Sequence, residues 1–162
     1  MSIYIFSRAV HSGKTTELLK WCNLQKNING ILMPDVNGYR KFLNIKIKEI
    51  FDAVCIDITK TNEPLTSIGK FNFYTTAFEK ANSILLDALS QNPHWLVIDE
   101  VGKLELKGEG FYRSVDEAVR FYGDKNKPGN FLITVRDGLC EEVISFFNIK
   151  NFKIIDRLDA IT

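Results

Sequence analysis

Three continuous apolar runs constrain the fold of this chain more than any other sequence feature. They lie at Ile3–Phe6, Trp95–Ile98 and Phe131–Val135, and none of them alternates with polar residues. Continuous apolar runs of this length are typical of strands buried on both faces, as in a mainly parallel sheet covered by helices. We therefore predict that these runs form the central strands of one sheet.

Segments with helical spacing of apolar residues lie between and after these runs. Apolar side chains there recur every three or four positions, which predicts helices with one buried face. Strand and helix thus alternate along the chain, and the predicted class is α/β, with a mainly parallel sheet flanked by helices. The helical positions are Leu18, Leu19 and Cys22; Phe78, Ala81, Ile84, Leu85, Ala88 and Leu89; Phe111, Val115, Ala118 and Val119; and Leu139, Val143, Ile144 and Phe147.

One region departs from this pattern of buried strands and helices. Apolar and polar residues alternate over residues 43–47 and again over residues 54–58. Alternation indicates half-exposed strands, which are usually antiparallel. We predict an antiparallel hairpin insertion at about residues 40–59, followed by a loop and a short strand near Phe71–Phe73.

Length and charge limit the remaining possibilities. The chain has 162 residues, which suits one core, so we expect a single domain over residues 1–162. The net charge is +1, which gives no reason to expect a nucleic-acid partner. The three cysteines are odd in number and widely spaced, which fits reduced thiols better than a disulfide framework. No stretch approaches the roughly 20 apolar residues that span a bilayer, and Ser2–Phe6 lacks the features of a signal peptide. We expect a cytoplasmic protein with no membrane partner, and the oligomeric state stays open.

A phosphate-binding sequence follows the first apolar run. Ser12–Thr16 reads SGKTT and stands between this predicted strand and the helix that contains Leu18. A loop that turns into a helix N-terminus offers backbone N–H groups and the positive end of the helix dipole to a phosphate. Lys14 is then expected to reach the β- and γ-phosphates, and the Thr15 hydroxyl to bind Mg²⁺. The full fingerprint has glycine where Arg8 stands, so the alternative is a basic helix N-terminus without a ligand.

Two carboxylates follow the second apolar run directly. Asp99 and Glu100 come after Trp95–Ile98, at the carboxyl end of a predicted parallel strand. Ligands of open α/β sheets bind at that edge of the sheet. We expect Asp99 to hold Mg²⁺ through water, and Glu100 to orient or deprotonate an attacking water. The alternative is an acidic strand end in solvent.

At this point the sequence resembles the small P-loop nucleoside-triphosphatases of the thermophile type. The segment 99–106, DEVGKLEL, is similar to the family's DEIGKMEL. The segment 30–36, GILMPDV, is similar to its GF-x-TPEV strand end, and residues 69–71 and 77–79 are similar to its G-K-Y and AFE sequences. The resemblance spans most of the chain.

The resemblance implies a P-loop NTPase fold and slow hydrolysis of ATP, GTP and other nucleoside triphosphates to diphosphate and phosphate, with Mg²⁺ and little base selectivity. Arg8 and His11 stand where the family has glycine, a departure that bears on activity more than on fold. The nucleotide-binding residues would be His11, Ser12, Gly13, Lys14, Thr15 and Thr16; the metal residues Thr15 and Asp99; and the catalytic residues Lys14, Glu100 and Lys103.

The role of Arg136 and the class of protein indicated by the phosphate loop each have more than one interpretation. Arg136 ends the third apolar run on the same side as Asp99, where it could bind phosphate or form a strand-end salt bridge. The loop itself is similar to that of the thymidine kinases, but the paired CxxC motifs of their zinc ribbon are not in this sequence. A nucleoside or nucleotide kinase is therefore the second hypothesis, and a non-catalytic nucleotide-binding module the third.

Overall fold

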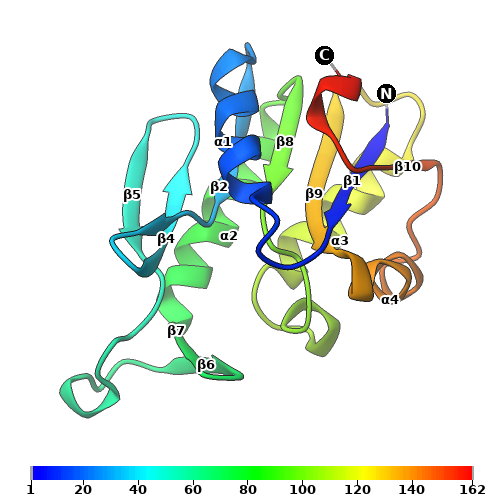
Figure 1. Cartoon of the computed structure of the whole chain (residues 1–162). Helices are drawn as coiled ribbons and strands as arrows, with labels where there is room; N and C mark the ends of the chain where they lie inside the picture. The colour runs from blue at the N-terminus through cyan, green and yellow to red at the C-terminus, as the bar shows by residue number, and fades with distance from the viewer. Residues whose placement is uncertain (1, 162) are drawn as a thin grey trace.

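The computed structural model describes residues 2–161, which form one large sheet between two layers of helices (Figure 1). The strands are β1 (Ile3–Arg8), β2 (Ile28–Leu32), β3 (Asp35–Val36), β4 (Tyr39–Asn44), β5 (Glu49–Asp52), β6 (Leu65–Ile68), β7 (Phe71–Tyr74), β8 (Trp95–Ile98), β9 (Asn130–Arg136) and β10 (Phe152–Ile155). The helices are α1 (Lys14–Leu24), α2 (Thr75–Ser90), α3 (Tyr112–Gly123) and α4 (Cys140–Phe146), with short 3-10 turns at Ile58–Lys60, Glu105–Lys107, Asp137–Leu139 and Leu158–Ile161.

The strand order of the large sheet is β10-β1-β9-β8-β2-β4-β3, with β5 paired to β4. The pairs from β10 to β2 are all parallel, and the pairs made by β4 are antiparallel. The carboxyl ends of β1, β8 and β9 therefore meet at one edge of the sheet, which is where ligands of open α/β sheets bind. The α/β class with a mainly parallel sheet is confirmed.

The two faces of the sheet bury alternate side chains of the same strand, as the period of a strand requires. On β8, Leu96 and Ile98 join the core cluster that also contains buried residues of α2, α3 and α4. Trp95 and Val97 join the other cluster, which is built around α1. Both faces are covered, which explains why the apolar runs of β1, β8 and β9 are continuous.

The antiparallel hairpin is present, but its second strand is not where the sequence pattern put it. The hairpin pairs β4 with β5, and Lys48 makes the turn with a positive φ of 57°. Residues 54–58 were expected to form the second strand, yet apart from a single bridge at Val54 they are not in one. The Asp57 side chain accepts a hydrogen bond from the Thr59 backbone N–H and starts a 3-10 turn instead. Aspartate often competes with strand pairing in this way.

The predicted short strand near Phe71–Phe73 is β7, and it pairs with β6 in a separate two-stranded sheet. This β6–β7 hairpin is tied to the rest of the chain by the bridge between Val54 and Phe73. All three cysteines are buried and free. None of the helices within residues 2–161 has the length and apolar character needed to cross a membrane.

Gly30 provides a direct test of the pairing between β2 and β8. It lies opposite Val97, and a Cβ at this position would be 2.2 Å from the Val97 carbonyl oxygen. Gly30→Ala is expected to lower the free energy of unfolding by about 2 kcal/mol or more, because backbone must move to admit the methyl group. Urea unfolding measures this change. The control is Gly123→Ala, at the end of α3, where a Cβ would meet no neighbouring side chain or strand within 4 Å. An equal loss of unfolding free energy in both variants would contradict this packing.

Candidate functional site

The loop between β1 and α1 presents the start of a helix to the carboxyl edge of the sheet. Gly13 caps α1 in the left-handed conformation, with φ 81°, and no atom lies within 4 Å of a Cβ built there. The first backbone N–H groups of a helix have no partner within it and are available to an anion. The Lys14 Nζ donates to the carbonyl oxygens of Arg8 at 3.1 Å and Ala9 at 3.0 Å. Ser12 and Thr16, which flank the segment 13–15, are exposed.

The two departures from glycine in this loop have different structural consequences. Arg8 ends β1, in register with Arg136 of β9, so its backbone is extended and needs no glycine. Its guanidinium forms an ion pair with Glu17 at 2.8 Å and lies over the ring of Phe6. His11, by contrast, has φ 59°, a left-handed conformation that a non-glycine residue adopts at a cost of about 1–2 kcal/mol. The strain of the loop is therefore at His11.

Asp99 is the buried centre of the site. Its side chain is 1% exposed, and its two oxygens accept three hydrogen bonds. The Thr134 hydroxyl donates to Oδ1 at 2.5 Å, while the Thr15 hydroxyl at 2.9 Å and the Met33 backbone N–H at 3.1 Å donate to Oδ2. A buried carboxylate is tolerated only when it is bonded in this way. Asp99 thus joins β8 to α1, to β9 and to the end of β2.

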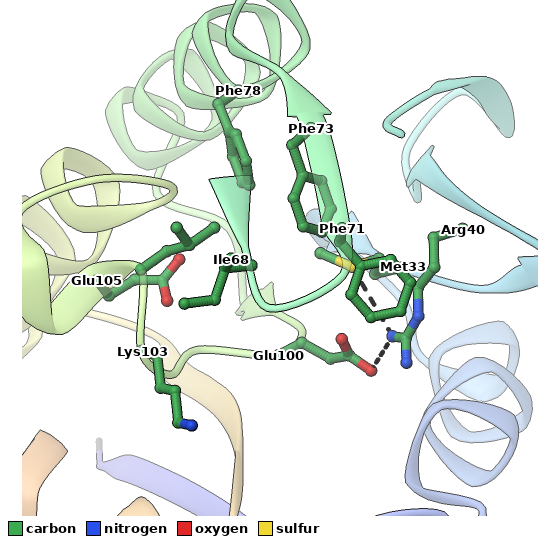
Figure 2. Close-up of a pocket in the computed structure, with 10 residues that line it drawn as sticks. Met33, Arg40, Ile68, Phe71, Phe73, Phe78, Glu100, Lys103 and Glu105 are labelled. Atoms are coloured by element: carbon green, nitrogen blue, oxygen red, sulfur yellow. Dashed lines mark hydrogen bonds and ion pairs between the residues drawn. The ribbon is translucent and has the colours of Figure 1, made fainter. Parts of the chain in front are cut away.

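Glu100 stands next to Asp99 in a strained backbone conformation. Its φ is 60°, and its backbone N–H donates to the Thr134 hydroxyl at 2.7 Å. The side chain is 36% exposed and forms an ion pair with Arg40, which Figure 2 shows at the rim of a pocket. Partial burial and the negative charge of Asp99 raise the pKa of Glu100, while Arg40 and Lys14 oppose that rise. Strained backbone that is held in place by surrounding contacts is common at functional sites.

Besides Arg40, the basic side chains expected at the site are Lys14, Lys103 and Arg136. Burial lowers the pKa of Lys14, although the charges of Glu100 and Asp99 act in the opposite direction. Lys103 is exposed and lines the same pocket as Glu100, with its amine pointing away from the aromatic side chains in Figure 2. Arg136 ends β9 and forms no ion pair with any residue in the described range 2–161.

Comparisons with known proteins assign the chain to a family. A family model described as NTPase matches residues 4–155. The chain belongs to this NTPase family. A search of the curated proteins finds no match.

Two solved structures share the fold of this chain. THEP1 from the hyperthermophile Aquifex aeolicus has a TM-score of 0.72 at 18% identity, over 99% of this chain and 92% of that chain. The human cancer-related nucleoside triphosphatase has a TM-score of 0.68 at 21% identity, over 96% of this chain and 87% of that chain. The family and the P-loop NTPase fold predicted from the sequence are confirmed.

Glu105 holds the loop that follows β8. Its side chain is 2% exposed, and it accepts backbone N–H bonds from Gly102 at 2.7 Å and Phe111 at 3.0 Å. Gly110 approaches so closely that a Cβ there would lie 2.4 Å from the Glu105 Oε1. Burial raises the pKa of Glu105 to about 7, against the effect of the two backbone bonds. The side chain fixes the segment that carries Lys103.

Sequence reasoning missed three residues of this arrangement: Arg40, Glu105 and Thr134. Thr134 had a usable signal, because it lies near the end of a predicted strand that is parallel to the strand before Asp99. Glu105 had one too, since it belongs to the segment 99–106 that carries the family resemblance. No sequence signal pointed to Arg40, because only the folded hairpin brings it to Glu100 from a distant part of the chain.

The raised pKa of Glu105 predicts a specific dependence of stability on pH. The folded protein is expected to keep this proton up to about pH 7, whereas the unfolded chain loses it near the ordinary value of 4.5. Between these values the folded state binds more protons, so the free energy of unfolding falls as the pH rises, by roughly 3 kcal/mol from this group. Urea unfolding from pH 4.5 to 8 measures it. Glu105→Gln should lose this part of the pH dependence; an unchanged profile in that variant would refute the assignment.

Proposed function

We propose that this protein hydrolyses nucleoside triphosphates to diphosphate and phosphate. The proposal is supported above all by the hydrogen bond of 2.9 Å between Thr15 and Asp99. This bond joins the first turn after the phosphate loop to the acidic end of β8. A triphosphate bound by the loop would therefore have its terminal phosphate beside Asp99 and Glu100, which is what phosphoryl transfer to water requires.

Binding of the triphosphate is assigned to the loop and to the start of α1. The amine of Lys14 would exchange the carbonyl oxygens of Arg8 and Ala9 for phosphate oxygens. Backbone N–H groups over residues 11–16 and the Ser12 and Thr16 side chains would complete the contacts. Arg136 has no competing ion pair among residues 2–161 and is proposed to approach the phosphates from β9.

Mg²⁺ is proposed as the cofactor, because the donor set around Thr15 and Asp99 suits it. Within residues 2–161 no three His, Cys, Asp or Glu side chains are grouped as a metal cage. Mg²⁺ does not need one, since it usually binds one or two protein oxygens together with phosphates and water. The Thr15 hydroxyl would be a direct ligand and the Asp99 carboxylate would act through water. A bound Mg²⁺ would neutralise charge on the transferring phosphate.

Glu100 is proposed as the base that takes a proton from the attacking water. Its raised pKa makes the carboxylate a better proton acceptor than an ordinary glutamate. The bonds to Arg40 and from its own N–H to Thr134 restrict where the carboxylate can lie. Lys103 is proposed to contribute positive charge on the same side of the site.

Lys14 and Glu100 are expected to have unequal effects on binding and turnover. Lys14→Ala should raise the Kd for Mg²⁺-ATP by roughly tenfold to a hundredfold and lower turnover as well, since a charged contact is lost in both the ground and transition states. Glu100→Gln should leave the Kd nearly unchanged and lower kcat on the order of a hundredfold or more. Calorimetric titration gives the Kd, and phosphate release gives kcat.

The matched controls are Lys107→Ala and Glu109→Gln, exposed positions of the nearby loop that do not line the site. Both controls should bind and hydrolyse Mg²⁺-ATP as the unmodified chain does. Wild-type hydrolysis by Glu100→Gln would remove Glu100 as the base. Failure of the unmodified chain to bind any common triphosphate at millimolar concentration would refute the proposed function itself.

A further inference from the structure

A pocket of about 130 Å³ opens beside Glu100, and none of residues 8–16, which include the phosphate loop, lines it. Its walls are mostly apolar and come from the end of β2, the β6–β7 hairpin and α2. These walls include Met33, Ile68, Phe71, Phe73 and Phe78. Figure 2 shows Arg40 and Glu100 joined at its rim, below the aromatic side chains. Hydrolysis needs only water beside the base, so this pocket is more than the proposed function requires.

The triphosphate's own base would not reach this pocket. In phosphoryl transfer the attacking and leaving oxygens lie roughly in line on opposite sides of the phosphorus. With Glu100 on the attacking side, the diphosphate and its nucleoside extend away from Glu100. The pocket continues beyond Glu100, toward β4 and β7. It therefore lies on the side from which an acceptor approaches.

The dimensions and lining of the pocket restrict its occupant. An apolar cavity of about 150 Å³ holds one benzene ring, so a pocket of about 130 Å³ suits one ring and not two. Phe73 and Phe78, with ring centroids 5.2 Å apart, offer aromatic contact to a planar ring. Arg40 and Lys103 supply hydrogen-bond donors at the rim, and Glu100 supplies an acceptor. A single heteroaromatic ring with both donors and acceptors matches this lining.

We infer that the pocket binds the ring of a pyrimidine nucleoside and places one of its hydroxyl groups beside Glu100 as a phosphoryl acceptor. This inference rests on the proposed binding of a triphosphate at the phosphate loop. The hydroxyl oxygen attacks the γ-phosphorus, and a new P–O bond forms as the bond to the β-phosphate oxygen breaks. The hydroxyl proton passes to Glu100 and then to solvent. The products are a nucleoside monophosphate and a nucleoside diphosphate.

Product analysis of the full chain tests this inference. Mg²⁺-ATP is incubated alone and with millimolar uridine, thymidine or adenosine, and the products are separated by anion-exchange chromatography. Uridine or thymidine should yield its monophosphate and raise ATP consumption at least tenfold. Adenosine, with two rings, should yield at least tenfold less monophosphate. Equal transfer to adenosine would overturn the assignment of a single-ring pocket.

Ile68→Trp and the milder Ile68→Phe place a larger side chain in the pocket and provide the matched variants. Either should raise the KM for uridine or thymidine at least tenfold, while the Kd for Mg²⁺-ATP reports separately on the phosphate loop. The control is Ile58→Trp, on an exposed turn outside the pocket, which should keep the nucleoside KM. An unchanged KM in a folded Ile68 variant would overturn the site.

The outcomes separate this inference from the proposed function. If ATP is bound and hydrolysed but no uridine or thymidine monophosphate forms, the acceptor pocket is refuted and the proposed hydrolysis stands. If ATP is neither bound nor hydrolysed, both are refuted. The inference is supported if a phosphoryl group is transferred to the pyrimidine nucleosides and if the Ile68 variants that fill the pocket abolish this transfer.

Discussion

The site depends on one buried carboxylate. Asp99 is 1% exposed, and the bonds it accepts from Thr15, Met33 and Thr134 connect three segments that are far apart in the sequence. Leaving such a group unpaired would cost several kcal/mol, so the phosphate loop, β2 and β9 are held to fixed positions around it. The same bonds bring the hydroxyl of Thr15 to the acidic end of β8, and the architecture of the fold thereby creates the site.

Glu100 and its surroundings follow from this constraint. Because Asp99 is fixed, Glu100 must turn at the end of β8, and Thr134 holds it there at φ 60°. Its carboxylate then lies between the phosphate loop and a separate pocket, and the hairpin that carries Arg40 determines which way it faces. Glu105 holds the loop beyond it by backbone hydrogen bonds. In the proposed reaction this places Glu100 on the attacking side of the transferring phosphate.

The sequence predicts those features that arise from local patterns. The largely apolar runs at β1, β8 and β9 identified the buried strands, because a strand covered on both faces buries side chains on both faces. Thr134 of β9 is the polar exception, and its buried hydroxyl is bonded to Asp99. Alternation over residues 54–58 misled, since the Asp57 side chain accepts a hydrogen bond from the Thr59 backbone N–H and starts a turn there. Arg40 could not be predicted, because its ion pair with Glu100 spans 60 positions and depends on the hairpin register. The positions of Lys14, Lys103 and Arg136 are now known, while their roles stay predictions.

The central claim is that Asp99 couples the phosphate loop to a metal-bound triphosphate. The most direct measurement is the Kd of ATP with and without Mg²⁺, for the unmodified chain and for Asp99→Asn, with circular dichroism as the check on folding. Asparagine keeps the size of the side chain but removes its charge and one acceptor oxygen. Mg²⁺ should strengthen ATP binding in the unmodified chain, and Asp99→Asn should reduce this gain at least tenfold. A folded Asp99→Asn variant in which Mg²⁺ strengthens binding as before would contradict this claim.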